Sequence, residues 1–211
     1  MTHPVGYGPE GNARVLIKLK DNLGAKDIGA ITGFFEVEPY WRCPCCFRSK
    51  MEIARLDRHS NLLCAIVSHH DHFTDNVGAH LHKRGIARQH NPDAFDAIEK
   101  SFERFSRLFI CQDCNVAEPQ AKAMVGAGRL FSFAPHEIAG FIKVTPNSPH
   151  EIDRARAQQI YDALKPSMQQ LADRLRAIGR ASIDECEPIA QAAWRVLKEA
   201  NNNRGLKEAA E

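Results

Sequence analysis

The chain has 211 residues, of which 44% are hydrophobic and 26% are charged, a composition typical of a globular protein. Its 28 basic and 26 acidic side chains leave a net charge of +2, so overall charge does not indicate a nucleic-acid partner. No apolar run reaches the roughly 20 residues that a membrane-spanning helix needs, and we expect no membrane contact. The first residues lack the basic and apolar regions of a secretory signal, which predicts a cytoplasmic protein with reduced thiols.

The organisation of the chain predicts three regions. Residues 1–15 are rich in glycine and proline and predict a flexible arm, and the segments ARVLIKLKDNL and IGAITGFFEVEPYW are compatible with either strand or helix. We expect an N-terminal arm with a flanking element over residues 1–40, a core that carries the chemistry over 41–127, and a mainly helical C-terminal lobe over 128–211. Together these regions predict an α+β protein.

Four cysteines form two C-x-x-C pairs, Cys43 with Cys46 and Cys111 with Cys114. A single pair would suit a redox dithiol or arise by chance, whereas two such turns supply the four thiolates of a tetrahedral zinc site. The two pairs therefore predict a structural Zn²⁺, and two unrelated pairs of buried thiols are the alternative. Cys45 offers an alternative ligand, but we expect its side chain to point away from the side of the chain that the Cys43 and Cys46 side chains share.

A histidine cluster follows the apolar run LLCAIV, which predicts a buried strand with Cys64 as a small core residue. In an extended chain His69 and His70 point to opposite sides, so one can face a metal ion while the other faces a substrate. Asp71 can then orient an imidazole or contact the metal, and His72 returns to the side of His70. A metal site, a catalytic base and a polar turn at the end of a strand are all compatible with this cluster.

This combination of residues suits the hydrolysis of a phosphodiester. A divalent metal polarises the phosphate and stabilises the leaving oxygen, while a neutral imidazole, with an unperturbed pKa of about 6.5, deprotonates the attacking water. A hard divalent cation also needs oxygen ligands. Asn115 supplies one directly after Cys114, at a position that a zinc site would hold rigid.

The long segment between the histidines and the second cysteine pair predicts an insertion at about residues 73–108. It contains GAHLHKRGIARQHNP, which predicts a basic loop, and PDAFDAIEKSFERFSRLFI, which predicts a helix. Arg84 and Arg88 of this loop are candidates for phosphate contacts, which position a backbone without reading bases. A solvated basic loop is the equal alternative. Lys122 is a further candidate because it follows Asn115 by one or two helical turns.

The C-terminal lobe carries no concentrated chemistry. Residues 148–151 contain a serine, a proline and a glutamate at helix-start positions, and apolar residues recur every three or four positions over 152–178. Pro166 should kink or split this helix, and residues 182–185 predict the start of a final helix. The apolar face predicts packing on the core or on another subunit, which makes a homodimer through these helices a candidate assembly.

The order of the motifs resembles that of the HNH, or ββα-metal, nucleases, and most closely the branch of the phage recombination endonuclease VII. The motifs here are CPCC, HHDH and CQDCNVAEPQAK, and the resemblance covers roughly residues 41–125. In that family the cysteines hold a structural zinc beneath a β-hairpin and a helix. The resemblance implies that His69 and Asn115 bind a catalytic Mg²⁺ or Mn²⁺ and that His70 is the general base. Motifs of the endonuclease VII type usually begin with Asp where His69 stands, although other HNH branches use His there.

The resemblance implies a zinc-stabilised ββα-metal core with an inserted loop and helix, in an endonuclease that hydrolyses DNA by a one-metal mechanism. A non-catalytic zinc-binding module that recognises nucleic acid or a protein is the alternative from another class. A nuclease fold that has lost its activity is a third. One bound zinc without a site for a second divalent ion would favour the non-catalytic module.

Overall fold

The computed structural model describes most of the chain, namely residues 9–83, 88–89, 92–184, 195 and 198. The chain divides into two compact units. The first unit comprises Met1–His70 and Phe105–Ile160, and the second comprises Asp71–Arg104 and Tyr161–Glu211. No described helix combines the length and the apolar character that crossing a bilayer requires. The domain boundaries expected from the sequence stay predictions.

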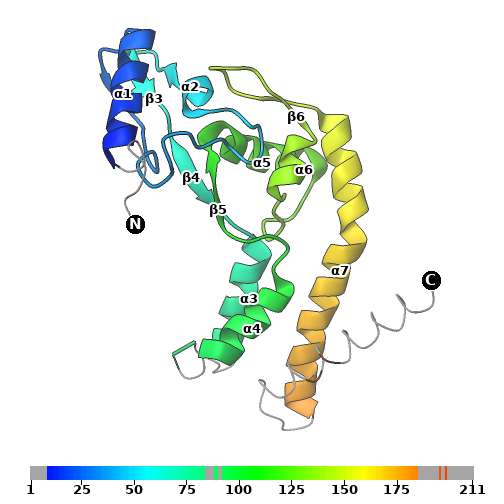
Figure 1. Cartoon of the computed structure of the whole chain (residues 1–211). Helices are drawn as coiled ribbons and strands as arrows, with labels where there is room; N and C mark the ends of the chain where they lie inside the picture. The colour runs from blue at the N-terminus through cyan, green and yellow to red at the C-terminus, as the bar shows by residue number, and fades with distance from the viewer. Residues whose placement is uncertain (1–8, 84–87, 90–91, 185–194, 196–197, 199–211) are drawn as a thin grey trace, which may run out of the picture. The chain divides into compact units, whose positions relative to one another are not determined.

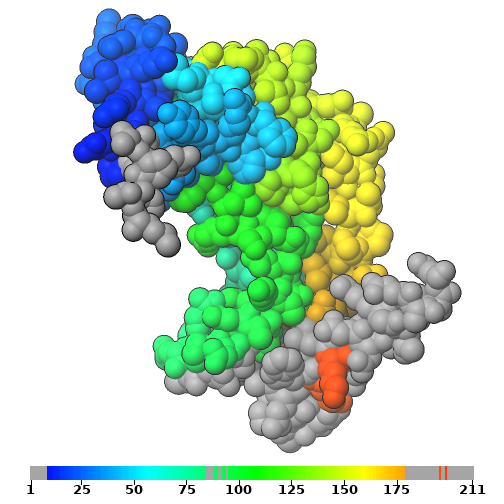
Figure 2. Space-filling view, in the orientation of Figure 1, coloured from blue at the N-terminus to red at the C-terminus, as the bar shows by residue number. Residues whose placement is uncertain are grey.

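The first unit opens with helix α1, Pro9–Leu23 (Figure 1). Pro9 suits the first helical position, and Leu16 and Leu19 are buried three residues apart on one face. The opposite face of α1, including Ile17, is exposed, and the helix forms part of the surface seen in Figure 2. The predicted flexible arm is therefore helical from residue 9, and its residues 1–8 lie outside the described part of the chain.

A small three-stranded sheet follows α1. Strand β3 (Asn61–Leu63) lies in the middle, parallel to β1 (Asp27–Ile28) and antiparallel to β2 (Arg55–Leu56). A short helix, α2 (Lys50–Ile53), precedes β2 and follows the first cysteine pair. The turn between β2 and β3 is held by Asp57, whose Oδ1 accepts hydrogen bonds from the amides of residues 59 and 61 at 2.8 Å each.

A second pair of strands leads into the helix that carries Asn115. Strand β4 (Ile66–His69) pairs antiparallel with β5 (Leu108–Cys111), so that residue 66 lies opposite 111 and residue 69 opposite 108. Helix α5 (Gln112–Val125) follows β5 without a loop and packs against both strands (Figure 1). The residues LFI were expected at the end of a helix, but their pairing with β4 makes them a strand. The predicted α+β class is confirmed.

The rest of the first unit is built around an aromatic cluster. Phe133 packs edge-on against Phe131 and Phe141, with ring centroids 4.7 and 4.9 Å apart. Along the chain, helix α6 (Pro135–Ala139) lies between Phe133 and Phe141. A two-stranded ladder of β6 (Ile142–Lys143) and β7 (Glu151–Ile152) follows. Residues 148–150 thus form an irregular segment that leads into β7 at residue 151, where the sequence predicted the start of a helix.

Helix α7 (Arg154–Asp184) begins after this ladder, where the Asp153 carboxylate accepts a hydrogen bond of 2.9 Å from the amide of Arg156. Pro166 lies inside α7 without ending it. Its position is exposed, so water can satisfy the carbonyl group that the proline leaves without a helical donor. The final helix predicted after residue 182 lies outside the described residues, except that residues 182–184 belong to α7.

The second unit contains helix α3 (His72–Lys83), helix α4 (Pro92–Phe102) and the part of α7 from residue 161 onward. Helix α3 includes the first part of the predicted basic loop, residues 78–83, because its apolar residues recur at helical spacing and become buried. The core of this unit consists of side chains from all three helices: Phe73, Val77, Leu81, Phe95, Ile98, Phe102, Leu175 and Ile178.

Candidate metal centre and histidine site

The two C-x-x-C pairs meet in the first unit. The sulfur atoms of Cys43, Cys46, Cys111 and Cys114 lie within 4.8 Å of one another, and all four residues are buried. The Sγ atoms of residues 43 and 114 are 3.7 Å apart, as are those of residues 46 and 111. Four thiolates about 2.3 Å from one Zn²⁺ form a tetrahedron with edges of about 3.8 Å. The predicted cysteine set is therefore confirmed as a buried tetrad compatible with a structural metal such as zinc.

Local backbone structure presents each cysteine pair to this tetrad. The first pair lies in a tight turn in which the Phe47 amide donates to the Cys43 carbonyl at 2.8 Å, with Phe47 in the left-handed region at φ 59°. In the second pair, Cys111 ends β5 and Cys114 lies in the first turn of α5. Residues three apart at a helix start lie on one side, so both sulfur atoms can face one ion.

The four thiols of the tetrad differ in the direction of their pKa shifts. Hydrogen bonds with Cys111 and Cys114 lower the pKa of both Cys43 and Cys46 below the ordinary value of a thiol. Hydrogen bonds within the tetrad and burial raise the pKa of Cys111 and Cys114. Zinc binds the thiolate form, so a bound ion would lower the pKa of all four thiols. Outside the tetrad, burial raises the pKa of the Cys64 thiol to about 12 and keeps it neutral in the core.

Arg48 is a buried guanidinium beside the tetrad, and the sequence patterns did not single it out. It is 2% exposed. It donates hydrogen bonds to the Sγ atoms of Cys46 at 3.4 Å and Cys111 at 3.6 Å, and to Asp113 Oδ2 at 2.7 Å. Burial opposes its charge, but the hydrogen bonds with Cys46 and Asp113 raise its pKa above the usual range. A Zn²⁺ ion with four thiolates carries a charge of about −2, which Arg48 partly offsets.

Arg48 also connects the tetrad to the segment before β7. Its Nη1 donates to the carbonyl oxygens of Thr145 at 3.0 Å and Ser148 at 2.9 Å. His150 Nε2 lies 3.2 Å from Arg48 Nη2 and 3.3 Å from Cys114 Sγ. Because these residues are about 100 positions from Arg48, no local pattern could have predicted that they surround the cysteines.

His69 ends strand β4 with its ring buried at 4% exposure. Its Nε2 lies 2.8 Å from the carbonyl oxygen of Phe133, and its ring stacks on Phe105 with centroids 5.0 Å apart. Because a carbonyl can only accept, Nε2 carries the proton, and the lone pair of the neutral ring is on Nδ1. A backbone carbonyl that orients an imidazole in this way is typical of histidines that bind metals.

The backbone of Phe133 also contacts the face of α5 that carries Asn115. The amide of Phe133 donates to Glu118 Oε1 at 3.3 Å, and Glu118 lies three residues after Asn115 on the helix. His69 and this face of α5 are therefore joined through the backbone of one residue, Phe133. Burial raises the pKa of Glu118, and the Lys122 ammonium 3.6 Å away acts in the opposite direction. His70 follows directly after β4, and both His70 and Asn115 are partly buried.

Asp71 lies in the second unit and caps a helix there. Its Oδ1 accepts a hydrogen bond of 3.0 Å from the Phe73 amide, and its Oδ2 accepts one of 3.1 Å from the Arg104 amide. The first of these is the bond of an N-cap residue at the start of α3. Asp71 thus has a structural role that does not depend on a metal ion.

Two of the predicted phosphate contacts, Arg88 and Lys122, have partners within the protein. Arg88 pairs with Asp96 at 2.8 Å and with Glu99 at 2.5 Å, and its guanidinium lies 5.0 Å from the centroid of the Phe95 ring. Lys122 is buried, with its Nζ near Glu118 and 3.4 Å from the carbonyl oxygen of residue 129. Arg84 lies outside the described residues.

No family model matches the chain, and no significant similarity to a curated protein or to a solved structure was found. The resemblance to HNH nucleases therefore rests on the three sequence motifs.

Proposed function

We propose that the chain is a metal-dependent endonuclease of the HNH type that hydrolyses DNA phosphodiester bonds. One observation supports this proposal above the others. The antiparallel pair β4–β5 ends in His69 and His70, and it continues through Cys111 into α5, which carries Asn115. The strand–strand–helix order and the placement of the motifs on it are those that the resemblance implies.

The residues fit a catalytic Mg²⁺ or Mn²⁺. The Phe133 carbonyl directs the lone pair of His69 to Nδ1, and Asn115 on α5 would supply an amide oxygen. When bound, the ion would polarise the scissile phosphate and stabilise the leaving oxygen. His70 would accept a proton from the attacking water, because the next residue along an extended chain points to the other side from His69.

The cysteine tetrad would hold a zinc ion with a structural role. Four thiolates fill all four positions of a tetrahedral ion and leave none for a substrate. The tetrad instead joins the turn at residues 43–46 to the start of α5, and so holds Asn115 next to β4 and β5. A loss of zinc would therefore disturb the proposed catalytic residues indirectly.

A zinc-binding interaction module without catalysis is the second candidate function. It is favoured by the internal ion pairs of Arg88 and the burial of Lys122, which leave these two predicted phosphate contacts engaged within the protein. Metal content separates the candidates, because the nuclease requires a second divalent site whereas the module requires the tetrad alone.

The decisive experiment compares cleavage by the native chain and by His70→Ala. Supercoiled, linear, branched and single-stranded DNA are each incubated with protein and Mg²⁺ or Mn²⁺. We expect cleavage of at least one form, reduced by about 10²- to 10⁴-fold in His70→Ala while the zinc content is unchanged. His59→Ala is the matched control, because His59 is an exposed histidine of the same unit. Equal cleavage by the His70 variant would remove this residue from its proposed role.

A further inference from the structure

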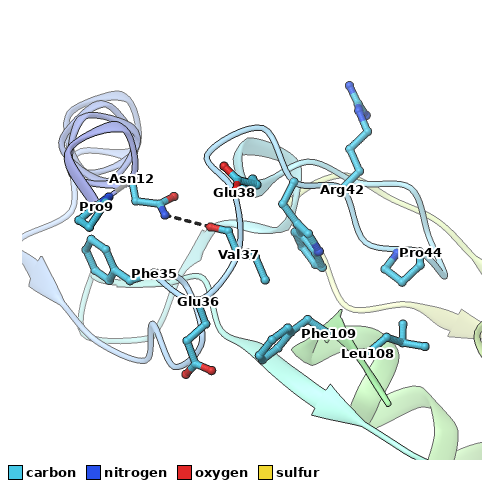
Figure 3. A pocket seen from close by; sticks show the side chains of 11 residues that line it. Pro9, Asn12, Phe35, Glu36, Val37, Glu38, Arg42, Pro44, Leu108 and Phe109 are labelled. Carbon is cyan, nitrogen blue, oxygen red and sulfur yellow. Dashed lines mark hydrogen bonds between the residues drawn. The ribbon is translucent and has the colours of Figure 1, made fainter. Parts of the chain in front are cut away.

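A cavity of about 750 Å³ lies in the first unit, between the start of α1, the segment 35–44 and the start of β5 (Figure 3). None of the proposed metal ligands lines it. Its size is within the range of about 300–1,000 Å³ that is typical of ligand sites. We propose that this cavity binds a basic side chain, lysine or arginine, of a partner peptide.

Aromatic rings supply the first element of such a site. Phe35, Trp41 and Phe109 line the cavity, and Phe35 is 48% exposed. The face of an aromatic ring carries negative electrostatic potential and attracts an ammonium or guanidinium group. The methylene groups of a lysine or arginine side chain can pack on the same rings while the charged end reaches the rim.

The charges of the lining residues supply the second element. Glu36 and Glu38 both line the cavity, and both are exposed. Among the described lining residues Arg42 is the one basic side chain, and it extends away from Val37 and Phe109 (Figure 3). It donates to the Phe47 carbonyl at 2.9 Å and lies 3.5 Å from the Glu52 carboxylate. The two glutamate carboxylates that line the cavity therefore favour the binding of a cation and disfavour that of a phosphate backbone.

The cavity wall is held in place before any ligand binds. Asn12 Nδ2 donates to the Val37 carbonyl at 2.9 Å, as the dashed line in Figure 3 shows. The buried Lys50 ammonium donates to the carbonyl oxygens of Phe34 at 2.8 Å and Val37 at 3.2 Å. These bonds fix the backbone on both sides of Phe35, so the peptide would not have to order this part of the wall.

The test uses the fluorescence of Trp41 in a Trp194→Phe chain, which retains this single tryptophan. The probes are three short synthetic peptides that differ at two adjacent positions, occupied by lysine, norleucine or glutamate. We expect the lysine peptide to change the fluorescence saturably and to bind roughly tenfold more tightly than the norleucine peptide. Glu36→Gln/Glu38→Gln should weaken the binding of the lysine peptide by a similar factor. Asp21→Asn/Asp93→Asn removes the same charge at exposed positions outside the cavity and should have little effect.

Several results would overturn the proposal. These are the absence of a saturable response to the lysine peptide, equal binding of the norleucine or glutamate peptide, and equal weakening by the two double variants. A fluorescence change that depends on protein concentration alone would show that a second copy of this chain fills the cavity, and tighter binding of a single-stranded oligonucleotide would assign it to DNA. The inference does not depend on nuclease activity, so His70→Ala should bind the lysine peptide as the native chain does.

Discussion

Arg48 and Asp113 form a buried ion pair of 2.7 Å across a separation of 65 positions in the chain. Arg48 follows the first cysteine pair by two residues, and Asp113 lies between the two cysteines of the second pair. Arg55 contacts the other carboxylate oxygen of Asp113 at 2.5 Å. Charged side chains thus join the two halves of the cysteine tetrad, in addition to any metal ion that the four cysteines would hold.

The Arg48→Met variant should lower the free energy of unfolding by about 3–5 kcal/mol, because it removes the fully buried one of the two basic partners of the Asp113 carboxylate. Urea denaturation of the zinc-loaded protein measures this loss. Arg42→Met is the matched control, since Arg42 is exposed and its pairing with Glu52 at 3.5 Å should contribute less than about 1 kcal/mol. Equal effects of the two variants would contradict a stabilising role for the buried pair.

The purified chain should contain about one zinc ion, and Cys114→Ser should lose it together with the folded structure of the first unit, because zinc binding contributes directly to folding at such sites. Elemental analysis and circular dichroism before and after chelation measure the two effects. Cys64→Ala removes a buried thiol outside the tetrad and should retain the zinc. Retention of zinc by Cys114→Ser would argue against the four-cysteine site.

His69→Ala and Asn115→Ala should each weaken the binding of Mn²⁺ by about 10- to 100-fold, since each removes a proposed ligand. Isothermal titration of the zinc-loaded chain with Mn²⁺ measures this change. His69→Asp should restore part of the affinity, because a carboxylate suits a hard cation and the related motifs usually begin with Asp. Unchanged Mn²⁺ affinity in both alanine variants, with the zinc retained, would leave the proposed second metal site without support.

Asp71→Ala should destabilise the second unit by about 1–2 kcal/mol through the loss of the N-cap of α3, without changing the zinc content or the affinity for Mn²⁺. Asp71→Asn should recover much of the stability, because an asparagine oxygen accepts the same amide. Thermal unfolding and metal titration of both variants distinguish a role of Asp71 as a helix cap from a role as a metal ligand. A large fall in Mn²⁺ affinity would instead support the ligand role that the sequence suggested.

The stability of the first unit should rise with pH between about 8 and 10.5. Burial lowers the pKa of Lys50 from 10.5 to about 8. Within this window the unfolded chain still binds the proton that the folded chain releases, so raising the pH favours the folded state, by at most about 3 kcal/mol. Below this window Lys50 is protonated in both states, and its contribution no longer depends on pH. Urea denaturation across the window measures the slope.

Lys50→Met provides the control for this pH dependence. The variant lacks the titrating amine and should lose the part of the slope that Lys50 contributes, although its overall stability falls because three oxygen atoms lose their buried donor. The same slope in Lys50→Met and in the native chain would show that another group causes the rise.

Local patterns in the sequence were sufficient for the chemically distinctive parts of this protein. The C-x-x-C spacing predicted the tetrad because two turns of this kind place their sulfur atoms within reach of one ion. The run LLCAIV predicted one strand that ends at the histidines, but the structure divides it, since its first two residues belong to β3 and its last two to β4, which continues to His69. Both inferences depend on neighbours within a few residues, which the covalent chain alone brings together.

Tertiary contacts decided the rest. Leu108–Cys111 becomes a strand because β4 lies beside it, and residues 151–152 become a strand because β6 does. The Phe133 carbonyl that sets the tautomer of His69 is 64 residues away from it, and Asp113 is 65 from Arg48. Hydrogen bonds and ion pairs of this kind form only when packing removes distant groups from water together, so their partners are determined by the fold and not by spacing along the chain.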